Sequence, residues 1–483
     1  MIISFALLLL TAPGRCVPAS GDGHIVLESA VAATGLRNTD TRLMHVQGFD
    51  MVSQDYQSDR TYPPFLSSVT AFDSWYSPTT GIERTSARTT LARSSFPEPV
   101  FVGTETASYL VRDTALVPSE QAHASLYATR PLNIWAMLHD WMASPDVRVV
   151  ARCDYRDYPR LVLSRAGPQG EERLFLTEHN HFPIKLDRME SHYLWGQVHV
   201  EYVYSTWQRQ DDVYLPAASF RIVDGRTTIE REFGPTALVR GDSAPALPVM
   251  PVRARPMGYP IDGFLAPTAP DTIRVGPNAF LLKNVGYTET VILARDTVYV
   301  LDATQGEARA QHDSTWIGRL FPGHHPIVLV VTDLAWPHIA GVRYWVAQGA
   351  TVVAHRAARK FLESVVAKRW TQAPDLLERR RAQVHFKFVA VSDTMSLANG
   401  DILLLAVDGR TSEVALAAYD RPLRFLWASD YIQTLAAPSA YLDDVWQAVL
   451  REHLDPERVA GEHLTLSSWT IADQLARRTP KEN

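Results

Sequence analysis

A proline-rich segment in the middle of the chain constrains the fold most strongly, because it separates two stretches with different patterns. Residues 243–260 hold prolines at positions 245, 248, 251, 256 and 260. Proline fixes φ and has no backbone N–H, so such a segment favours extended backbone and interrupts helices and strand ladders. We therefore predict a linker at 243–270 between a first domain, 23–242, and a second domain, 271–483. Two domains are also what a chain of 483 residues is expected to form.

The first domain is predicted to be antiparallel and β-rich, with one or two helices. In residues 198–204, valines and tyrosines alternate with His199 and Glu201, which is typical of a strand buried on one face. A short helix is expected to begin at Gly23. An amphipathic helix is expected at 132–143, where apolar residues recur at helical spacing before Ser144 and Pro145.

The amino terminus has the pattern of a secretory signal peptide. Its apolar stretch of about ten residues is too short to span a bilayer, and Val17, Pro18 and Ala19 suit a cleavage site. We predict a signal peptide at 1–19, no transmembrane anchor, and export to the periplasm or the extracellular space. Cleavage after Ala19 would remove Cys16 and leave Cys153 alone, so no intramolecular disulfide is expected.

Composition excludes several classes of function. A net charge of -6 argues against nucleic acid as a partner, because a nucleic-acid binder needs a basic surface to displace counterions. Two cysteines are too few for a cysteine-based zinc finger or an iron–sulfur cluster, so any metal must rely on His and carboxylates. There is no Gly-x-Ser-x-Gly elbow for a hydrolase triad and no glycine-rich phosphate loop.

The second domain is predicted to mix strands and helices. Three short β-rich runs lie between Ala279 and Asp302, and a helical stretch follows toward Leu320. Residues 327–332 are apolar on both faces, which is typical of a central strand covered on both sides. A helix is expected to end at Gln348, because Gly349 is the residue that a helix terminus favours next.

Four separated pieces of this domain resemble the metallo-β-lactamase superfamily, in the sense of its metal-hydrolase fold. The matching positions are Thr332, His338 and Gly341 in the first motif, 349–355 in the second, 424–430 before a metal-bridging Asp, and 461–463 at the last metal-binding His. The resemblance covers roughly 271–483. It implies a C-terminal αββα sandwich, preceded by the antiparallel-sheet domain with few helices, and thus an α+β protein.

The resemblance also implies an eroded dinuclear zinc site. At the family's first two motif His positions stand Asp333 and Ala335, and Pro337 stands at the motif Asp. Only the third motif His survives, as His338, and the hairpin His of the family corresponds to Thr411. The first metal position therefore keeps two carboxylates and no imidazole, which falls short of the three protein ligands of a catalytic zinc.

The second metal position keeps His338, Asp430 and His463 as its predicted ligands. Two imidazoles and one carboxylate match a mononuclear catalytic pattern that leaves a fourth position open to water. The site could thus hold one zinc ion at most, and none if the erosion has removed binding altogether. We assign Asp333 as the candidate catalytic residue, which would orient the metal-bound water or accept its proton.

Three functions remain open from the sequence. The first is an exported, hydrolase-like protein acting on an unidentified small molecule. The second is a pseudoenzyme, in which the same fold serves as a binding or scaffold domain. The third is an apolar-ligand carrier, because the first domain is loosely similar to the half-barrels of bacterial lipoprotein carriers. The sequence predicts neither the substrate nor the oligomeric state.

Overall fold

The computed structural model describes most of the chain: residues 15–35, 41–54, 65–91, 94–105, 107–113, 115–155, 158–167, 169–240, 269–284, 286–407, 414–437 and 439–478. These residues belong to two compact units. The first comprises 1–53, 67–191 and 198–260, and the second comprises 54–66, 192–197 and 261–483. Nearly all of the predicted linker and the first 14 residues of the predicted signal peptide lie outside the described residues.

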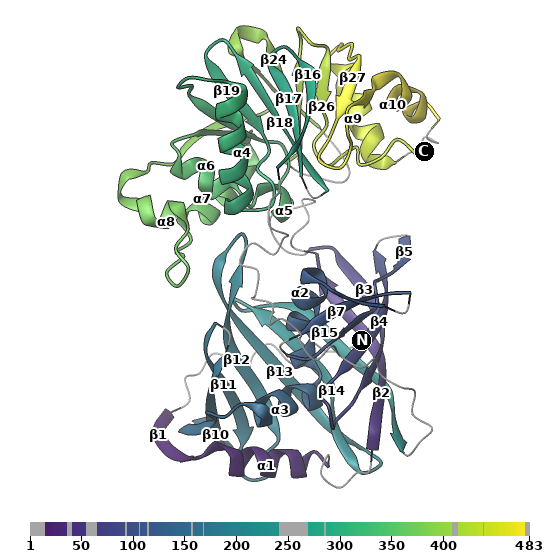
Figure 1. The fold of residues 1–483 in the computed structure, drawn as a ribbon, viewed down its shortest axis with the longest axis vertical. Helices are drawn as coiled ribbons and strands as arrows, with labels where there is room; N and C mark the ends of the chain where they lie inside the picture. The colour runs from purple at the N-terminus through teal and green to yellow at the C-terminus, as the bar shows by residue number, and fades with distance from the viewer. Residues whose placement is uncertain are drawn as a thin grey trace. The chain divides into compact units, whose positions relative to one another are not determined.

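One 15-stranded sheet forms the framework of the first unit, and its described pairings are antiparallel (Figure 1). The strands are β1 (Arg15–Asp22), β2 (Thr41–Ser53), β3 (Ser67–Tyr76), β4 (Glu83–Leu91), β5 (Ser94–Pro97), β6 (Phe101–Gly103), β7 (Ser108–Arg112), β8 (Ala115–Pro118), β9 (Arg148–Tyr155), β10 (Tyr158–Gly167), β11 (Gly170–Thr177), β12 (Pro183–His192), β13 (Gly196–Gln210), β14 (Val213–Val223) and β15 (Arg226–Arg240). The alternation predicted for residues 198–204 is confirmed, since every second residue of β13 from Val198 to Tyr204 is buried.

The described part of the first unit contains three α-helices, one more than predicted. Helices α1 (Gly23–Ala33) and α3 (Ile134–Ala143) match the predicted positions, with Asp22 and Asn133 accepting hydrogen bonds from the first turn of each. Helix α2 (Glu120–Thr129) was not predicted. Its sequence is rich in small and polar residues, so its buried contacts come from Ala122 and Leu126 rather than from a continuous apolar stripe.

Strands from separate parts of this sheet contact the segment that runs from the end of α2 into the first turn of α3. The hydroxyl of Tyr76 on β3 donates to the carbonyl of Trp135 at 3.1 Å, and the hydroxyl of Tyr204 on β13 donates to the carbonyl of Pro131 at 2.8 Å. Because β3 and β13 are separated by three strands in the sheet, the sheet curves around this segment. The protein's own helix α3 therefore fills the inside of the curve, where a carrier would need an open groove.

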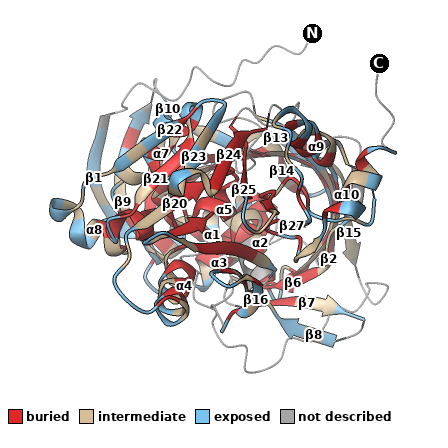
Figure 2. Ribbon diagram, turned by 90° about the horizontal axis from the view of Figure 1, so that it is seen from above, coloured by how far each residue is buried: buried red, intermediate tan, exposed pale blue. Residues whose placement is uncertain are grey.

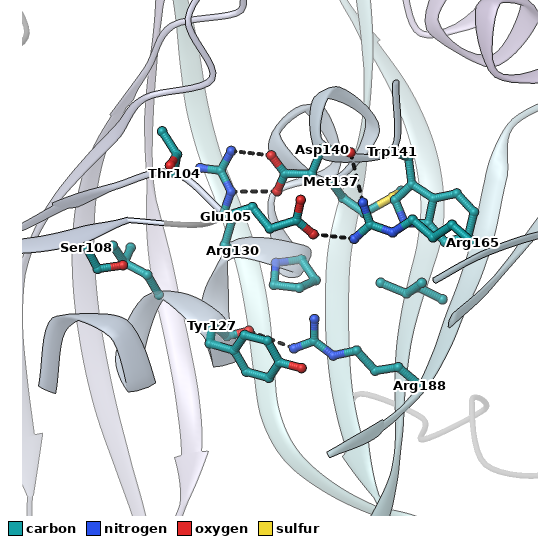
Figure 3. Close-up of a pocket in the computed structure, with 13 residues that line it drawn as sticks. Thr104, Glu105, Ser108, Tyr127, Arg130, Met137, Asp140, Trp141, Arg165 and Arg188 are labelled. Carbon is teal, nitrogen blue, oxygen red and sulfur yellow. Dashed lines mark hydrogen bonds and ion pairs between the residues drawn. The ribbon is translucent and has the colours of Figure 1, made fainter. Parts of the chain in front are cut away.

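A small cavity remains beside α2 and α3, with a volume of about 30 Å³ (Figure 3). This is room for about two water molecules. Its lining includes five charged side chains: Glu105, Arg130, Asp140, Arg165 and Arg188. The cavity is far too small for an acyl chain, so it does not support the apolar-ligand carrier.

Buried ion pairs are frequent in the first unit, and Glu190 lies in one of them. Its carboxylate is 2.7 Å from both Arg188 and Arg221. Burial by itself raises the pKa of Glu190, but the two guanidinium groups outweigh it and lower the pKa to about 2. This carboxylate therefore stabilises the fold above the pKa of the unfolded chain, about 4.3, and that contribution is lost as the pH falls through about 2.

We expect Glu190→Gln to lower the free energy of unfolding of the first unit by roughly 3 kcal/mol at pH 7. The difference from the parent should shrink below about pH 4, as the carboxylate begins to bind protons in the unfolded state. Urea titrations at pH 7 and pH 3 measure both values. Glu230→Gln is the matched control, since the pKa of Glu230 is raised and not lowered. A Glu190→Gln difference that did not depend on pH would contradict the assigned charge.

A disulfide joins Cys16 to Cys153, which corrects the expectation of an unpaired Cys153. The two residues are direct partners in the antiparallel register of β1 and β9. The sequence analysis missed the pair because it assumed that cleavage after Ala19 removes Cys16. In the structure that cleavage would fall inside β1 and cut the backbone between Cys16 and the rest of the chain.

We expect Cys153→Ser to lower the free energy of unfolding of the first unit by about 2–4 kcal/mol, because the bond closes a loop across a sequence separation of 137 residues. Urea unfolding without reductant measures the loss. Dithiothreitol should lower the midpoint of the parent by a similar amount and leave that of Cys153→Ser unchanged. Equal midpoints for parent and variant without reductant would show that the bond does not form in solution.

The described residues of the second unit form two sheets. The first has β16 (Asp271–Gly276), β17 (Ala279–Asn284), β18 (Tyr287–Ala294), β19 (Thr297–Leu301), β20 (Ile327–Val331), β21 (Thr351–His355) and β22 (Lys387–Val391) in sequence order. The second has β23 (Thr394–Leu397), β24 (Ile402–Ala406), β25 (Leu416–Asp420), β26 (Phe425–Trp427), β27 (Arg458–Ala460) and β28 (Ser467–Ser468). The helices are α4 (Glu307–Leu320), α5 (Trp336–Ile339), α6 (Val342–Ala347), α7 (Arg359–Ala367), α8 (Leu376–Arg380), α9 (Ala440–Arg451) and α10 (Trp469–Ala476).

These elements form four layers. One apolar cluster contains side chains of both sheets, for example Leu281, Val330, Leu404 and Trp427, so the sheets pack face to face. A second cluster packs α4, α6 and α7 on the outer face of the first sheet, and a third packs α9 and α10 on the second sheet. Figure 1 shows the two groups of helices on opposite sides, and Figure 2 shows β24 and β25 largely buried. The chain is thus an α+β protein, as predicted.

None of the helices in the described residues combines the length and the apolar character needed to cross a bilayer.

Candidate metal centre

The predicted site residues follow the carboxyl ends of strands in the second unit. Asp333 comes shortly after β20, and His338 lies on the short helix α5 that follows. Asp430 comes shortly after β26, and His463 shortly after β27. Strands β26 and β27 pair in parallel, so their carboxyl ends meet at one edge of the second sheet.

The structure brings His338, Asp430 and His463 together. One potential ligand atom from each residue lies within 4.8 Å of the others. Nε2 of His463 lies 3.4 Å from Oδ1 of Asp430. Two ligands of a tetrahedral zinc, each about 2.1 Å from the ion, are separated by about 3.4 Å. The spacing of this pair therefore fits a shared cation.

The hydrogen bonds of His463 leave the correct nitrogen available. Its Nδ1 lies 3.1 Å from the carbonyl oxygen of Gly286, which can only accept a hydrogen bond. Nδ1 must therefore carry the proton, and Nε2 faces Asp430 with a lone pair. Metal-binding histidines usually donate their second ring N–H in this way. Burial lowers the pKa of His463, which favours the neutral ring that binds a cation.

His338 is buried and lies against an acid that the sequence analysis did not assign. Nδ1 of His338 is 2.5 Å from Oε2 of Glu462, which has no exposed surface. Burial by itself lowers the pKa of His338, but the charge of Glu462 raises it well above its ordinary value. The sequence offers one hint of a role for Glu462, which is that it directly precedes the predicted ligand His463. That position does not show which way the Glu462 side chain points.

Asp302 is a second acid that the sequence analysis left without a role. It accepts hydrogen bonds from the backbone N–H of Thr332 at 2.7 Å, from the Thr332 hydroxyl at 2.5 Å and from Nε1 of Trp427 at 2.8 Å. Burial raises the pKa of Asp302 to about 6. The three hydrogen bonds lower the pKa, but burial has the larger effect. Asp302 thus ties the end of β20 to β26, and so holds together the two strand ends that precede His338 and Asp430.

Asp333, the candidate catalytic residue, is buried, with 1% of its surface exposed. Its Oδ1 accepts a hydrogen bond from the backbone N–H of Ala335, at the start of α5. The same oxygen is 3.7 Å from Nδ1 of His338. The carboxylate is buried because it caps the turn that leads into α5, a common use of Asp at such positions. It lies beside the predicted ligands and does not belong to the group of three.

The centre carries an excess of buried acids. Burial raises the pKa of Asp430 to about 7, and the nearby charges of Asp333 and Asp302 act in the same direction, while His338 opposes them. Carboxylates in a low-dielectric environment need a positive partner to remain charged. A divalent cation between His338, Asp430 and His463 would supply that charge, so the donor set fits the single metal that the resemblance implied.

The other positions of the motif contribute no ligand. Ala335 and Pro337 have no side-chain donor, although the carbonyl of Pro337 accepts a hydrogen bond from the N–H of Gln305 at 2.7 Å and so anchors α5. Thr411 lies outside the described residues.

A second group of possible ligands lies on the sheet of the first unit: Asp187, His199 and Glu201. A cation already stands between its acids, because the ammonium group of Lys185 is 3.0 Å from Asp187 and 2.7 Å from Glu201. This group is therefore an ion-pair network and a poorer fit for a metal.

Comparisons with known proteins give a limited result. No protein-family model matches the chain, and a search of curated proteins finds no match. Among solved structures, the chain is similar to DIM-1 metallo-β-lactamase, with 11% identity over 44% of this chain and 97% of that one and a TM-score of 0.34. It is also similar to a metallo-β-lactamase from Hirschia baltica (12% identity, 44% and 97% covered, TM-score 0.34) and to one from Erythrobacter litoralis (10%, 43% and 94%, 0.34).

Proposed function

We propose that the second unit is a metal-dependent hydrolase of the metallo-β-lactamase type, with a single divalent cation held by His338, Asp430 and His463. The observation that carries this proposal is the convergence of these three donors from three separate segments of the chain. Both histidines support it, since Nδ1 of each lies beside an oxygen atom, the Gly286 carbonyl for His463 and the Glu462 carboxylate for His338. Zinc is the cation that this mixture of nitrogen and oxygen donors suits best.

When bound, such a cation supplies water activation, because it lowers the pKa of its water toward about 7. The residues of the chain then have separate tasks. His338, Asp430 and His463 hold the cation, and Asp302 keeps their loops in place. Asp333, buried 3.7 Å from His338, is the nearby acid that we assign to receive a proton during hydrolysis. The substrate is an unidentified small molecule.

Metal analysis and a substrate panel test this proposal together. The full chain is incubated with zinc, freed of excess metal and measured by mass spectrometry, and its hydrolysis of a chromogenic β-lactam, a thioester and a phosphodiester is followed. We expect one zinc per chain, and hydrolysis of at least one substrate that stops with chelator and returns with zinc. A metal-free chain would favour the pseudoenzyme, and so would a metal-loaded chain that hydrolyses none of the three.

The role of Asp333 has its own test. We expect Asp333→Asn to lower kcat by about 10²–10⁴-fold, the usual contribution of a general base, while the zinc content stays at one per chain. Asp333→Asn keeps an oxygen that can still accept the hydrogen bond from Ala335, so α5 should form normally. An unchanged kcat would remove Asp333 from the mechanism without affecting the three ligands.

We also propose that the protein is exported, with any cleavage ahead of Cys16. The support is the Cys16–Cys153 disulfide, because such bonds persist mainly in oxidising compartments. Intact-mass analysis of the protein from a periplasmic fraction tests this. We expect a mass two hydrogens below that of the reduced form and an amino terminus before Cys16. A mature chain that begins at Ser20 would contradict this placement of the cleavage site.

A further inference from the structure

Glu462 is held rigidly in the core of the second unit. Its backbone N–H donates to the carbonyl of Ser429 at 2.9 Å, and its carbonyl accepts from the N–H of Thr288 at 2.8 Å. These two bonds connect it to the segment that follows β26 and to the start of β18. The side chain is fully buried, and its Oε2 lies 2.5 Å from Nδ1 of His338. The proposed function uses this contact only as support for His338 as a ligand and gives Glu462 no role of its own.

An imidazole ring binds a given cation through one of its two nitrogens. The nitrogen that carries the proton cannot bind, so the position of the proton determines which nitrogen is the ligand. A neutral ring carries one proton, on either Nδ1 or Nε2, and only the unprotonated nitrogen has a lone pair to give. A carboxylate beside Nδ1 stabilises the form with the proton there. Nε2 is then the donor, and the ring cannot turn over without losing the bond to the carboxylate.

The two histidines of the centre are fixed by different acceptors. For His463 the acceptor is the backbone carbonyl of Gly286. For His338 the neighbour is the Glu462 side chain, an ion-pair contact at 2.5 Å, and neither oxygen of that side chain has a hydrogen-bond partner in the described part of the chain. Oδ1 of Asp333, at 3.7 Å from the same nitrogen, is too far away to replace it. The orientation of His338 therefore depends on one carboxylate.

We propose that Glu462 is a positioning residue, which holds the proton of His338 on Nδ1 and thereby presents Nε2 to the cation. The inference rests on the proposed function in naming the cation, but the contact between Glu462 and His338 exists without it. A purely structural ion pair would contribute to folding only. A positioning residue also sets the tautomer of His338 and the affinity for the metal.

The proton on Nδ1 of His338 is detected first, on the full chain without metal. Protein labelled with ¹⁵N-histidine is expected to show a far-downfield Hδ1 resonance that is protected from exchange, and its absence in His338→Ala assigns it to His338. We expect Glu462→Ala to lose this resonance and Glu462→Gln to shift it upfield, because the amide oxygen is a weaker acceptor. Without such a resonance in the wild-type chain, the positioning role is overturned, whether or not any variant folds.

Metal affinity is measured second, by competition with a chromophoric chelator. We expect Glu462→Gln to bind zinc about 10–100-fold more weakly than the parent, the usual effect of losing a histidine's carboxylate partner. Asp420→Asn is the matched control, since Asp420 is also a buried acid of this unit but bonds to the backbone of Leu423. It should bind zinc like the parent.

The outcomes separate the two proposals. If the parent binds one zinc and Glu462→Gln binds it equally well, the inference fails and the proposed function stands. If the parent shows the Hδ1 resonance but binds no metal, the proposed function fails, while the contact between Glu462 and His338 is confirmed as one that fixes the ring.

Discussion

His463→Ala is expected to abolish stoichiometric metal binding and to leave the fold intact. The side chain of His463 is 32% exposed, so its removal costs little packing, but it takes away one of only three donors. We expect zinc affinity to fall by more than the 10–100-fold that is typical of losing a partner outside the coordination sphere. Any hydrolase activity should fall with it.

The control for this prediction is His324→Ala, because His324 is an exposed histidine of the same unit that lies outside the cluster. This variant should keep one zinc per chain. Metal content after removal of excess zinc, together with a circular dichroism spectrum, measures the effect. A His463→Ala protein that still held one zinc tightly would show that the cation binds elsewhere.

Gly461→Ala is expected to damage both stability and metal binding, although the added group is a single methyl. A Cβ at position 461 would lie 2.4 Å from the carbonyl oxygen of Ser429 and 3.1 Å from that of Ile432. Both contacts are with backbone, so one of the two loops must move. We expect a loss of about 1–3 kcal/mol in the free energy of unfolding, as for other overpacked positions. Zinc affinity should fall too, because these loops carry Asp430 and His463.

Gly318→Ala is the matched control, since nothing lies within 4 Å of a Cβ at that position of α4. Here alanine should be neutral or stabilise by up to about 1 kcal/mol, because it favours the helix more than glycine does. Urea unfolding and chelator competition on both variants give the comparison. Equal stability and affinity for Gly461→Ala and Gly318→Ala would mean that the loop after β27 is not packed as described.

Local patterns were sufficient to predict much of the second unit. Its buried strands are short apolar runs bounded by turn residues, and the resemblance to the family's motifs selected His338, Asp430 and His463 out of 16 histidines and many acids. The motif positions predict proximity because strands that end at the same edge of a sheet bring the loops after them close together, whatever the rest of the sequence is. That the three residues bind a metal is still a prediction.

The features that were missed depend on contacts between distant parts of the chain. Glu462 and Asp302 acquire a role only when the folded chain brings them to His338 and to Thr332 with Trp427, and no spacing rule encodes those contacts. The same is true of the bond between Cys16 and Cys153, which depends on the register of two strands. Helix α2 was missed for another reason, because tertiary packing stabilises it more than its own sequence pattern does.

The central claim is that one cation lies between His338, Asp430 and His463. Diffraction data from crystals of the full chain grown with zinc, recorded on both sides of the zinc absorption edge, test it most directly. We predict a single anomalous peak about 2.0–2.2 Å from a donor atom of each of the three residues. A zinc-loaded chain with no peak at this position, or with its peak beside Asp187, His199 and Glu201, would contradict the account.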